Sequence, residues 1–128
     1  MPKLEYVTPI LRVADVAASI GYYRERLGFE TTFTWGDPPG FAGVQRDAVE
    51  VMFCREGQGN PGTWMSLWVD DVDALHEELR ERGAEIRQPP TTMDWGVREM
   101  NVGDLDGHRL RFSTATDLPS DGVALRED

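Results

Sequence analysis

Two tryptophans that alternate along one predicted strand are the residues best suited to bind a ligand. In Trp64-Met-Ser-Leu-Trp68, every second side chain points to the same side, so Trp64, Ser66 and Trp68 share one face. Met65 and Leu67 form an apolar row on the other face. A flat aromatic ligand gains stacking energy against indole rings, and a cationic group is attracted to the ring faces. The other interpretation is that both tryptophans belong to the core, and the sequence leaves the two open.

The same alternation assigns residues of other predicted strands to the ligand side. Val49, Val51 and Phe53 form the better core row, which places Glu50, Met52 and Cys54 on the opposite face. On the last strand Leu110 and Phe112 pack inward, so Arg109 and Arg111 face the ligand. Trp35 and Trp95 each lie beside a loop. The predicted ligand-binding residues are Trp35, Glu50, Met52, Trp64, Ser66, Trp68, Trp95, Glu99, Arg109 and Arg111.

The charge of the chain limits the classes of partner. Its 128 residues include 13 Lys and Arg against 23 Asp and Glu, a formal net charge of −10. Nucleic acids and anionic membranes select clusters of Lys and Arg, so we expect neither as a partner. No apolar run approaches the roughly 18 residues of a membrane span, and the start of the chain does not resemble a signal peptide. We therefore expect a cytoplasmic protein whose ligand is a neutral or cationic small molecule.

Cysteine and histidine are too few and too scattered for the common metal or nucleophile sites. Cys54 is the only cysteine, which precludes an internal disulfide and cysteine-based zinc sites. His76 falls inside a predicted helix and His108 in a turn, and we interpret both as surface residues. A two-histidine iron site would need both on converging strands. We expect no metal, no cofactor and no catalytic residues.

The chain contains an internal repeat. Val13-Ala-Asp-Val16 matches Val69-Asp-Asp-Val72 at an offset of 56 residues, and Arg24-Glu-Arg26 matches Arg80-Glu-Arg82 at the same offset. One residue then drops out, so that Gly28 corresponds to Gly83. A period near half the chain length predicts two copies of one supersecondary unit.

Each copy has the pattern of a βαβββ module. Asp15 and Asp71, with Asp70 beside it, are good helix N-caps, and Gly28 and Gly83 are typical C-terminal stops. The predicted strands are 8–13, 29–35, 41–45 and 49–54 in the first copy and 64–69, 85–87, 97–102 and 109–113 in the second.

These elements predict an α+β fold of two tandem βαβββ modules whose curved sheets form a cleft. We expect one domain over residues 1–116, with modules at about 5–54 and 63–114 and a Gly/Pro-rich linker at 55–62. A polar tail follows at 117–128.

The sequence resembles the vicinal oxygen chelate superfamily, which includes glyoxalase I, extradiol dioxygenases and the fosfomycin and bleomycin resistance proteins. The resemblance covers roughly residues 5–114. It is carried by Leu11-Arg-Val-Ala-Asp15, Tyr22-Tyr-Arg-Glu-Arg-Leu-Gly-Phe29, the helix start at 69–72, Trp95-Gly-Val-Arg-Glu-Met100 and Asp104-Leu-Asp-Gly-His-Arg-Leu-Arg-Phe112. It implies the glyoxalase/bleomycin resistance fold without fixing a chemistry, because one fold hosts many functions.

The residues at the metal positions of this superfamily favour its metal-free branch. The enzymes place His or Glu at one position on each of four strands, where this sequence has Thr8, Glu50 or Val51 (the register is uncertain by one residue), Trp64 and Arg111. At most one of these is a metal ligand. The resemblance is therefore greatest to the bleomycin resistance proteins, whose dimers sequester a cationic aromatic glycopeptide in pockets between the subunits.

Three hypotheses follow. The first is a homodimeric antibiotic-resistance protein that sequesters a bulky aromatic, cationic compound without metal or chemistry. The second is a lyase, isomerase or dioxygenase of the same superfamily that uses Glu50 with His108, or a metal-free acid–base enzyme that uses Glu50 or Glu99. The third is a ligand-sensing or protein-interaction domain. Metal content separates the second from the first, and a cavity filled by the protein's own side chains would favour the third.

Overall fold

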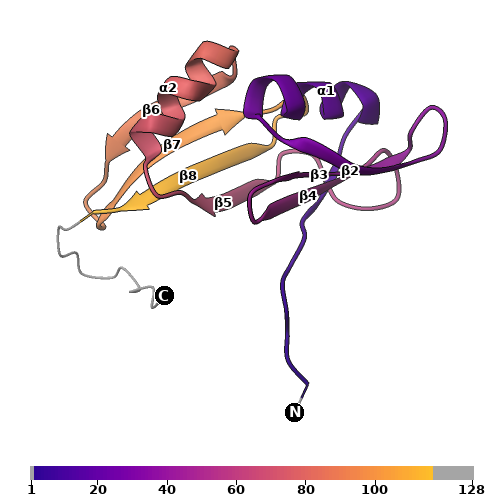
Figure 1. Cartoon of the computed structure of the whole chain (residues 1–128), viewed down its shortest axis with the longest axis horizontal. Helices are drawn as coiled ribbons and strands as arrows, with labels where there is room; N and C mark the ends of the chain where they lie inside the picture. The colour runs from indigo at the N-terminus through magenta and orange to yellow at the C-terminus, as the bar shows by residue number, and fades with distance from the viewer. Residues whose placement is uncertain (1, 117–128) are drawn as a thin grey trace. The chain divides into compact units, whose positions relative to one another are not determined.

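A computed structural model describes residues 2–116, which form two compact units, each with one sheet and one helix (Figure 1). The first unit contains residues up to 63 together with the turn 104–108, and the second contains 64–103 and the residues from 109 on. The predicted tail at 117–128 lies outside the described residues. Neither of the helices in the described part of the chain is long and apolar enough to cross a lipid bilayer.

The first unit is a four-stranded sheet with its helix on one face (Figure 1). Its elements are β1 (Ile10–Arg12), α1 (Val16–Leu27), β2 (Glu30–Trp35), β3 (Phe41–Arg46) and β4 (Val49–Cys54). The strands lie in the order β1-β4-β3-β2. Strand β1 runs parallel to β4, and the other neighbours are antiparallel.

The second unit repeats this arrangement. Its elements are β5 (Trp64–Trp68), α2 (Val72–Arg82), β6 (Glu85–Thr92), β7 (Val97–Gly103) and β8 (Arg109–Ala115). The strands lie in the equivalent order β5-β8-β7-β6, and β5 is parallel to β8. The expected α+β fold of two tandem βαβββ modules is confirmed.

Both helices begin and end at the residues that the repeat indicated. Asp15 and Asp71 each accept a hydrogen bond at 3.0 Å from the backbone amide three residues further on. Gly28 and Gly83 end the helices with φ of 79° and 80°. Residues with a Cβ rarely adopt this left-handed conformation, which is why glycine stands at both positions. The residue that drops out of the repeat between the helix starts and the glycine stops is a helix residue, because α1 has 12 residues and α2 has 11.

Strand alternation gives each helix an apolar row to cover. In β5 the side chains of Met65 and Leu67 are buried, whereas their neighbours Trp64, Ser66 and Trp68 are exposed. Buried apolar side chains also recur at every second residue of β4, β7 and β8, although β7 buries Glu99 and Asn101 between them. The buried rows are Leu11, Ala42, Val44, Val51 and Phe53 in the first unit and Met65, Leu67, Met100, Val102, Leu110 and Phe112 in the second.

Strand β6 is longer than the sequence indicated. We expected a strand over 85–87 only, because Pro89 and Pro90 lack the amide hydrogen that a ladder needs. The strand continues to Thr92 because β6 is an edge strand, whose outer side requires no donor. Its pairing with β7 is irregular at this point, with register shifts between Ile86 and Thr91.

The turn 104–108 joins β7 to β8 but belongs to the first unit. One carboxylate oxygen of Asp104 accepts hydrogen bonds from the amides of Asp106 (3.0 Å) and His108 (2.9 Å). Its other oxygen accepts a 2.7 Å hydrogen bond from the Tyr23 hydroxyl. Asp106 accepts one from the Ala14 amide at 2.9 Å. The acidic residues of this motif therefore hold the turn in place.

His108 is a buried structural residue, so its assignment to the surface was wrong. Its side chain is fully buried. Nδ1 accepts a hydrogen bond from the Thr63 amide at 3.0 Å, which leaves the ring proton on Nε2, and Nε2 donates to the Arg12 carbonyl at 2.7 Å. A turn histidine is usually solvated, and nothing in the local sequence indicates these two distant backbone partners. His76 is half-buried on α2, with Nδ1 3.9 Å from the Glu77 carboxylate.

The buried Tyr23 hydroxyl makes stability sensitive to alkaline pH. Burial raises the pKa of Tyr23 well above the ordinary phenol value of about 10, and the charge of Asp104 adds to the shift. The unfolded chain therefore loses this proton near pH 10 while the folded protein keeps it. The stabilisation is complete below pH 10 and is lost as the pH rises above it.

We expect the free energy of unfolding to fall by up to about 1.4 kcal/mol per pH unit above pH 10 because of this residue. Urea unfolding at pH 8 to 11 measures the slope. Tyr23→Phe is less stable at pH 8 by about 2 kcal/mol, since a hydrogen bond to a carboxylate is lost, and its slope above pH 10 is shallower. If the free energy of unfolding fell equally steeply with pH in the wild type and in Tyr23→Phe, this account would be wrong.

Candidate functional site

The second sheet has one face that no helix of its unit covers, which we call the tryptophan face. It contains Trp64, Ser66 and Trp68, on the opposite side of β5 from the buried Met65 and Leu67. Trp64 is 57% exposed and Trp68 is 42% exposed, so neither is a core residue. Trp64 and Trp68 are four residues apart on the strand, so their Cα atoms are about 13 Å apart, and the small Ser66 lies between them.

Two arginines extend the tryptophan face onto β8. Arg109 pairs with Trp64 and Arg111 with Ser66, and both side chains are half-buried. The Arg109 guanidinium carbon lies 5.4 Å from the Trp64 ring centroid, within the range of a cation–π contact. Trp64 therefore already has a cationic partner inside the protein, which holds its ring in position.

Polar side chains are buried on β7 on the same face. Met100 and Val102 are fully buried in the core row, and alternation puts Glu99 and Asn101 on the other side. Glu99 is opposite Ser113, and Asn101 is opposite Arg111. Glu99 and Asn101 are only 6% and 8% exposed. The centre of the tryptophan face is thus polar, and its β5 edge is aromatic.

Asn101 has an unsatisfied hydrogen-bond acceptor. Its Nδ2 donates to the Gln88 side chain at 3.3 Å, but its buried Oδ1 has no partner within residues 2–116. A buried acceptor without a donor costs about 1–3 kcal/mol. Sequence analysis missed Asn101, although alternation along the predicted strand 97–102 puts it on the same face as Glu99.

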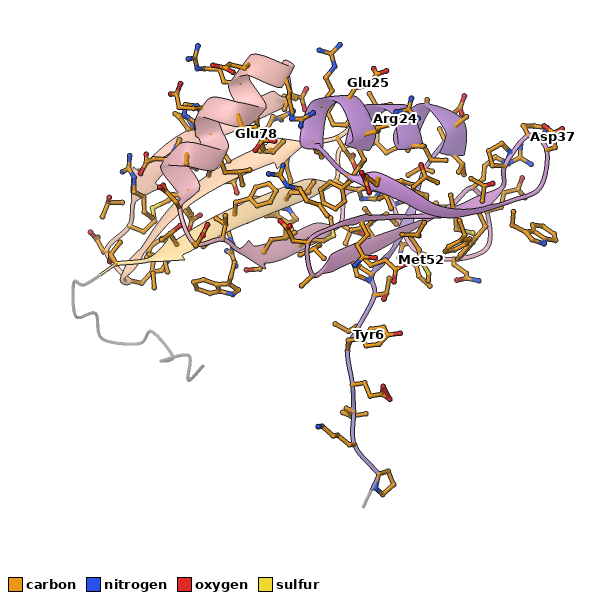
Figure 2. All side chains as sticks on the ribbon, in the orientation of Figure 1. Tyr6, Arg24, Glu25, Asp37, Met52 and Glu78 are labelled. Carbon is orange, nitrogen blue, oxygen red and sulfur yellow. The ribbon has the colours of Figure 1, made fainter. Side chains whose placement is uncertain are left out.

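The first sheet also has a face opposite its helix, which we call the Glu50 face. Figure 2 shows Met52 on the side of this sheet away from α1. Glu50 lies two residues before it on the same face, while Val51 is fully buried in the core row. This removes the uncertainty between Glu50 and Val51. The hydroxyls of Thr8 and Thr32 each donate to the Glu50 carboxylate in long hydrogen bonds of 3.4 Å.

An aromatic group lies on the Glu50 face that sequence analysis only partly found. Trp35, the predicted member, is 74% exposed at the end of edge strand β2. Phe33 and Phe41 stack with centroids 5.8 Å apart and ring planes at 25°. The Phe33 ring lies over Gly43, where a Cβ would collide with it. Counting back two residues from Trp35 would have indicated Phe33.

The ten predicted residues therefore divide between the units. Trp35, Glu50 and Met52 belong to the first, and the other seven belong to the second. Six of these seven lie on the tryptophan face: Trp64, Ser66, Trp68, Glu99, Arg109 and Arg111. Trp95 is 47% exposed in the turn between β6 and β7, beyond the row of Trp68.

The side chains at the metal positions do not fit a metal ion. In the first unit the pair is Thr8 and Glu50, which are joined by a hydrogen bond. In the second unit the two positions are assigned to Trp64 and Arg111, and the register puts Arg109 opposite Trp64 and Arg111 opposite Ser66. An indole and a guanidinium are not metal ligands. Within residues 2–116, no group of three or more His, Cys, Asp or Glu side chains is placed to hold a metal.

Comparison with known proteins places this fold in a family. Residues 3–112 match the Glyoxalase/Bleomycin resistance protein/Dioxygenase superfamily. The chain belongs to this superfamily. No match was found among curated proteins. Membership confirms the family resemblance of the sequence and leaves the reaction or ligand open, because the superfamily includes both enzymes and resistance proteins.

Several solved structures have the same fold. TioX from Micromonospora sp. ML1 aligns with a TM-score of 0.77 and 24% identity, over 87% of this chain and 98% of TioX. A superfamily member from Sphaerobacter thermophilus DSM 20745 aligns with a TM-score of 0.72 and 28% identity, over 87% of this chain and 98% of that protein. The bleomycin resistance determinant encoded on transposon Tn5 aligns with a TM-score of 0.74 and 24% identity, over 90% of this chain and 100% of the determinant.

We expect the purified protein to carry no stoichiometric metal. Elemental analysis after purification without chelator should find less than one equivalent of Zn, Ni, Mn or Fe combined, because Trp64 and Arg111 provide no ligands. Adding these ions should not raise the unfolding temperature. One equivalent of bound metal that is lost in Glu50→Gln would contradict this interpretation.

Proposed function

We propose that the protein binds a bulky, flat aromatic and cationic compound without chemical change and thereby sequesters it. The observation that carries this proposal is the pair of exposed tryptophans on one face, Trp64 and Trp68. Exposed indole rings are costly to leave in water and are a common platform for aromatic ligands. Each stacking contact contributes about 0.5–1.5 kcal/mol beyond the area that it buries.

The distribution of charge indicates where a cation would lie. Arg109 and Arg111 make the centre of the tryptophan face locally positive, so a ligand cation is disfavoured beside them. Glu99 on β7 is a carboxylate of this face, in the register row of Trp68. The net charge of −10 adds a long-range attraction for cations. We therefore expect the aromatic part of the ligand over β5 and its positive group toward Glu99.

The enzyme hypothesis receives less support from the geometry. An enzyme using Glu50 with His108 would need a free imidazole nitrogen, but both ring nitrogens of His108 bind backbone groups. The side chains at the metal positions do not fit a metal. The fold shared with the Tn5 bleomycin resistance determinant is consistent with sequestration, and at 24% identity it supports no more than the fold.

We further propose a cytoplasmic homodimer. Residues 2–7 extend away from the first sheet as an exposed arm, and Figure 2 shows Tyr6 standing away from the unit. Leu4 is 99% exposed and Val7 is 88% exposed. Apolar side chains at this exposure are typical of a segment that a partner covers. A second copy of the chain is the partner that the superfamily resemblance favours.

The binding proposal predicts a loss of affinity on removing either ring. We expect bleomycin and other planar cationic compounds to quench tryptophan fluorescence, and Trp64→Ala or Trp68→Ala to weaken binding by about 1–3 kcal/mol, or roughly tenfold or more. Isothermal titration calorimetry measures the affinities independently of the fluorescence that the variants lose.

The matched control is Leu105→Ala, which removes an apolar side chain that is 57% exposed in the turn of the first unit. This variant should bind as tightly as the wild type. If none of the planar compounds bound the wild type, or if the tryptophan variants bound as well as Leu105→Ala, the proposal would be wrong.

The dimer proposal predicts a change in mass. Light scattering should give twice the chain mass for the wild type and about the chain mass when Leu4, Tyr6 and Val7 are all replaced by serine. The circular dichroism spectrum should not change, since the three side chains are exposed. Leu105→Ser is the control for a general loss of surface apolar area, and a monomeric wild type would refute the proposal.

A further inference from the structure

One polar atom on the tryptophan face has a hydrogen-bonding requirement that the protein does not meet. Asn101 Oδ1 is buried and unpartnered within the described residues, although the same amide donates through Nδ2 to Gln88. The Asn101 side chain is more than nine-tenths buried. An acceptor in this state is satisfied only by an incoming N–H or O–H donor.

The neighbours of Asn101 on this face are a carboxylate, a guanidinium and an aromatic edge. The guanidinium belongs to Arg111, the register partner of Asn101, and makes no hydrogen bond to Asn101 Oδ1. Glu99 lies two residues away on the same side of β7, is also more than nine-tenths buried, and can only accept hydrogen bonds when ionised. The register row of Asn101 runs through Arg111 to Ser66, which lies between the two tryptophans. The unsatisfied acceptor is therefore level with the middle of the tryptophan pair.

We propose that Asn101, with Glu99 beside it, selects aromatic ligands that carry an N–H donor on the ring, such as aryl amines and amides. This inference rests on the proposed aromatic binding and adds the chemical group that is recognised. Strands β5 and β7 are separated by β8, so the tryptophans and Asn101 are about 10 Å apart across the sheet. A fused tricyclic ring with an amine at its end spans a comparable length.

The energetics favour a binding role over a structural one. A buried amide that stabilised the fold would have all of its hydrogen bonds made, whereas Asn101 leaves one unmade. Replacing it with leucine removes the unmet acceptor and places an apolar side chain of similar size there. We expect Asn101→Leu to be at least as stable as the wild type, the pattern of a residue kept for function.

The experiment compares two planar dyes of equal charge. Proflavine and acridine orange are both acridinium cations, but the two ring amines of proflavine carry N–H donors and those of acridine orange are fully methylated. Titration calorimetry measures both affinities on the full-length protein. We expect the wild type to bind proflavine about tenfold more tightly, the effect of one hydrogen bond of ordinary strength.

Three variants separate the contributions. Asn101→Leu should bind the two dyes with equal affinity, because both dyes still stack on the tryptophans. Glu99→Gln removes a negative charge but keeps an acceptor, so it should weaken both dyes by a similar factor. Thr116→Val is the matched control, because it removes the other buried unpartnered oxygen, Thr116 Oγ1, and it should retain the tenfold preference. Thermal unfolding of each variant checks its stability.

The outcomes distinguish this inference from the binding proposal beneath it. A preference for proflavine that Asn101→Leu loses and Thr116→Val keeps supports the inference. Equal binding of the two dyes to the wild type, or an undiminished preference in Asn101→Leu, overturns the inference and leaves aromatic binding intact. Binding of neither dye overturns the binding proposal itself, and the inference with it.

Discussion

Each four-stranded sheet of this protein has a single helix, and one helix covers only one face of a sheet. In each unit the apolar row therefore lies on the helix side of the sheet, with Leu11 and Phe53 in the first unit and Met100 and Leu110 in the second. The other face has no helix of its own unit above it, and it contains the groups that a core would not accept. Tryptophans, arginines and carboxylates gather there because alternation along the strands leaves them no other place.

The sequence was most informative where local chemistry determines the structure. Helix caps at Asp15 and Asp71 and stops at Gly28 and Gly83 depend on neighbouring residues, so they could be predicted from the chain alone. The alternating faces of β4, β5 and β8 could be predicted for the same reason. Contacts over long distances could not. The partners of His108 are 45 and 96 residues away, and only the folded chain shows that they replace solvent.

The two units show how far one framework tolerates different chemistry. Their strand orders and helix ends correspond, yet the equivalent positions hold Thr8 and Glu50 in one unit and Trp64 and Arg109 in the other. The first pair is joined by a hydrogen bond and the second by a cation–π contact. The second contact joins the neighbouring parallel strands β5 and β8, and the first joins β4 to a residue just before its parallel neighbour β1. The framework fixes where the side chains lie and leaves their chemical type free.

The turn 104–108 also bears on the order in which the chain acquires structure during synthesis. Residues 2–63 contain every strand and the helix of the first unit, but the acceptors for the Ala14 amide, the Tyr23 hydroxyl and the Thr63 amide are supplied some 40 residues later. The N-terminal half emerging from a ribosome thus lacks partners for three of its donors. Although the sequence is a repeat, the unit built by its first copy includes a turn from the second, and a fragment ending at the linker would lack these three contacts.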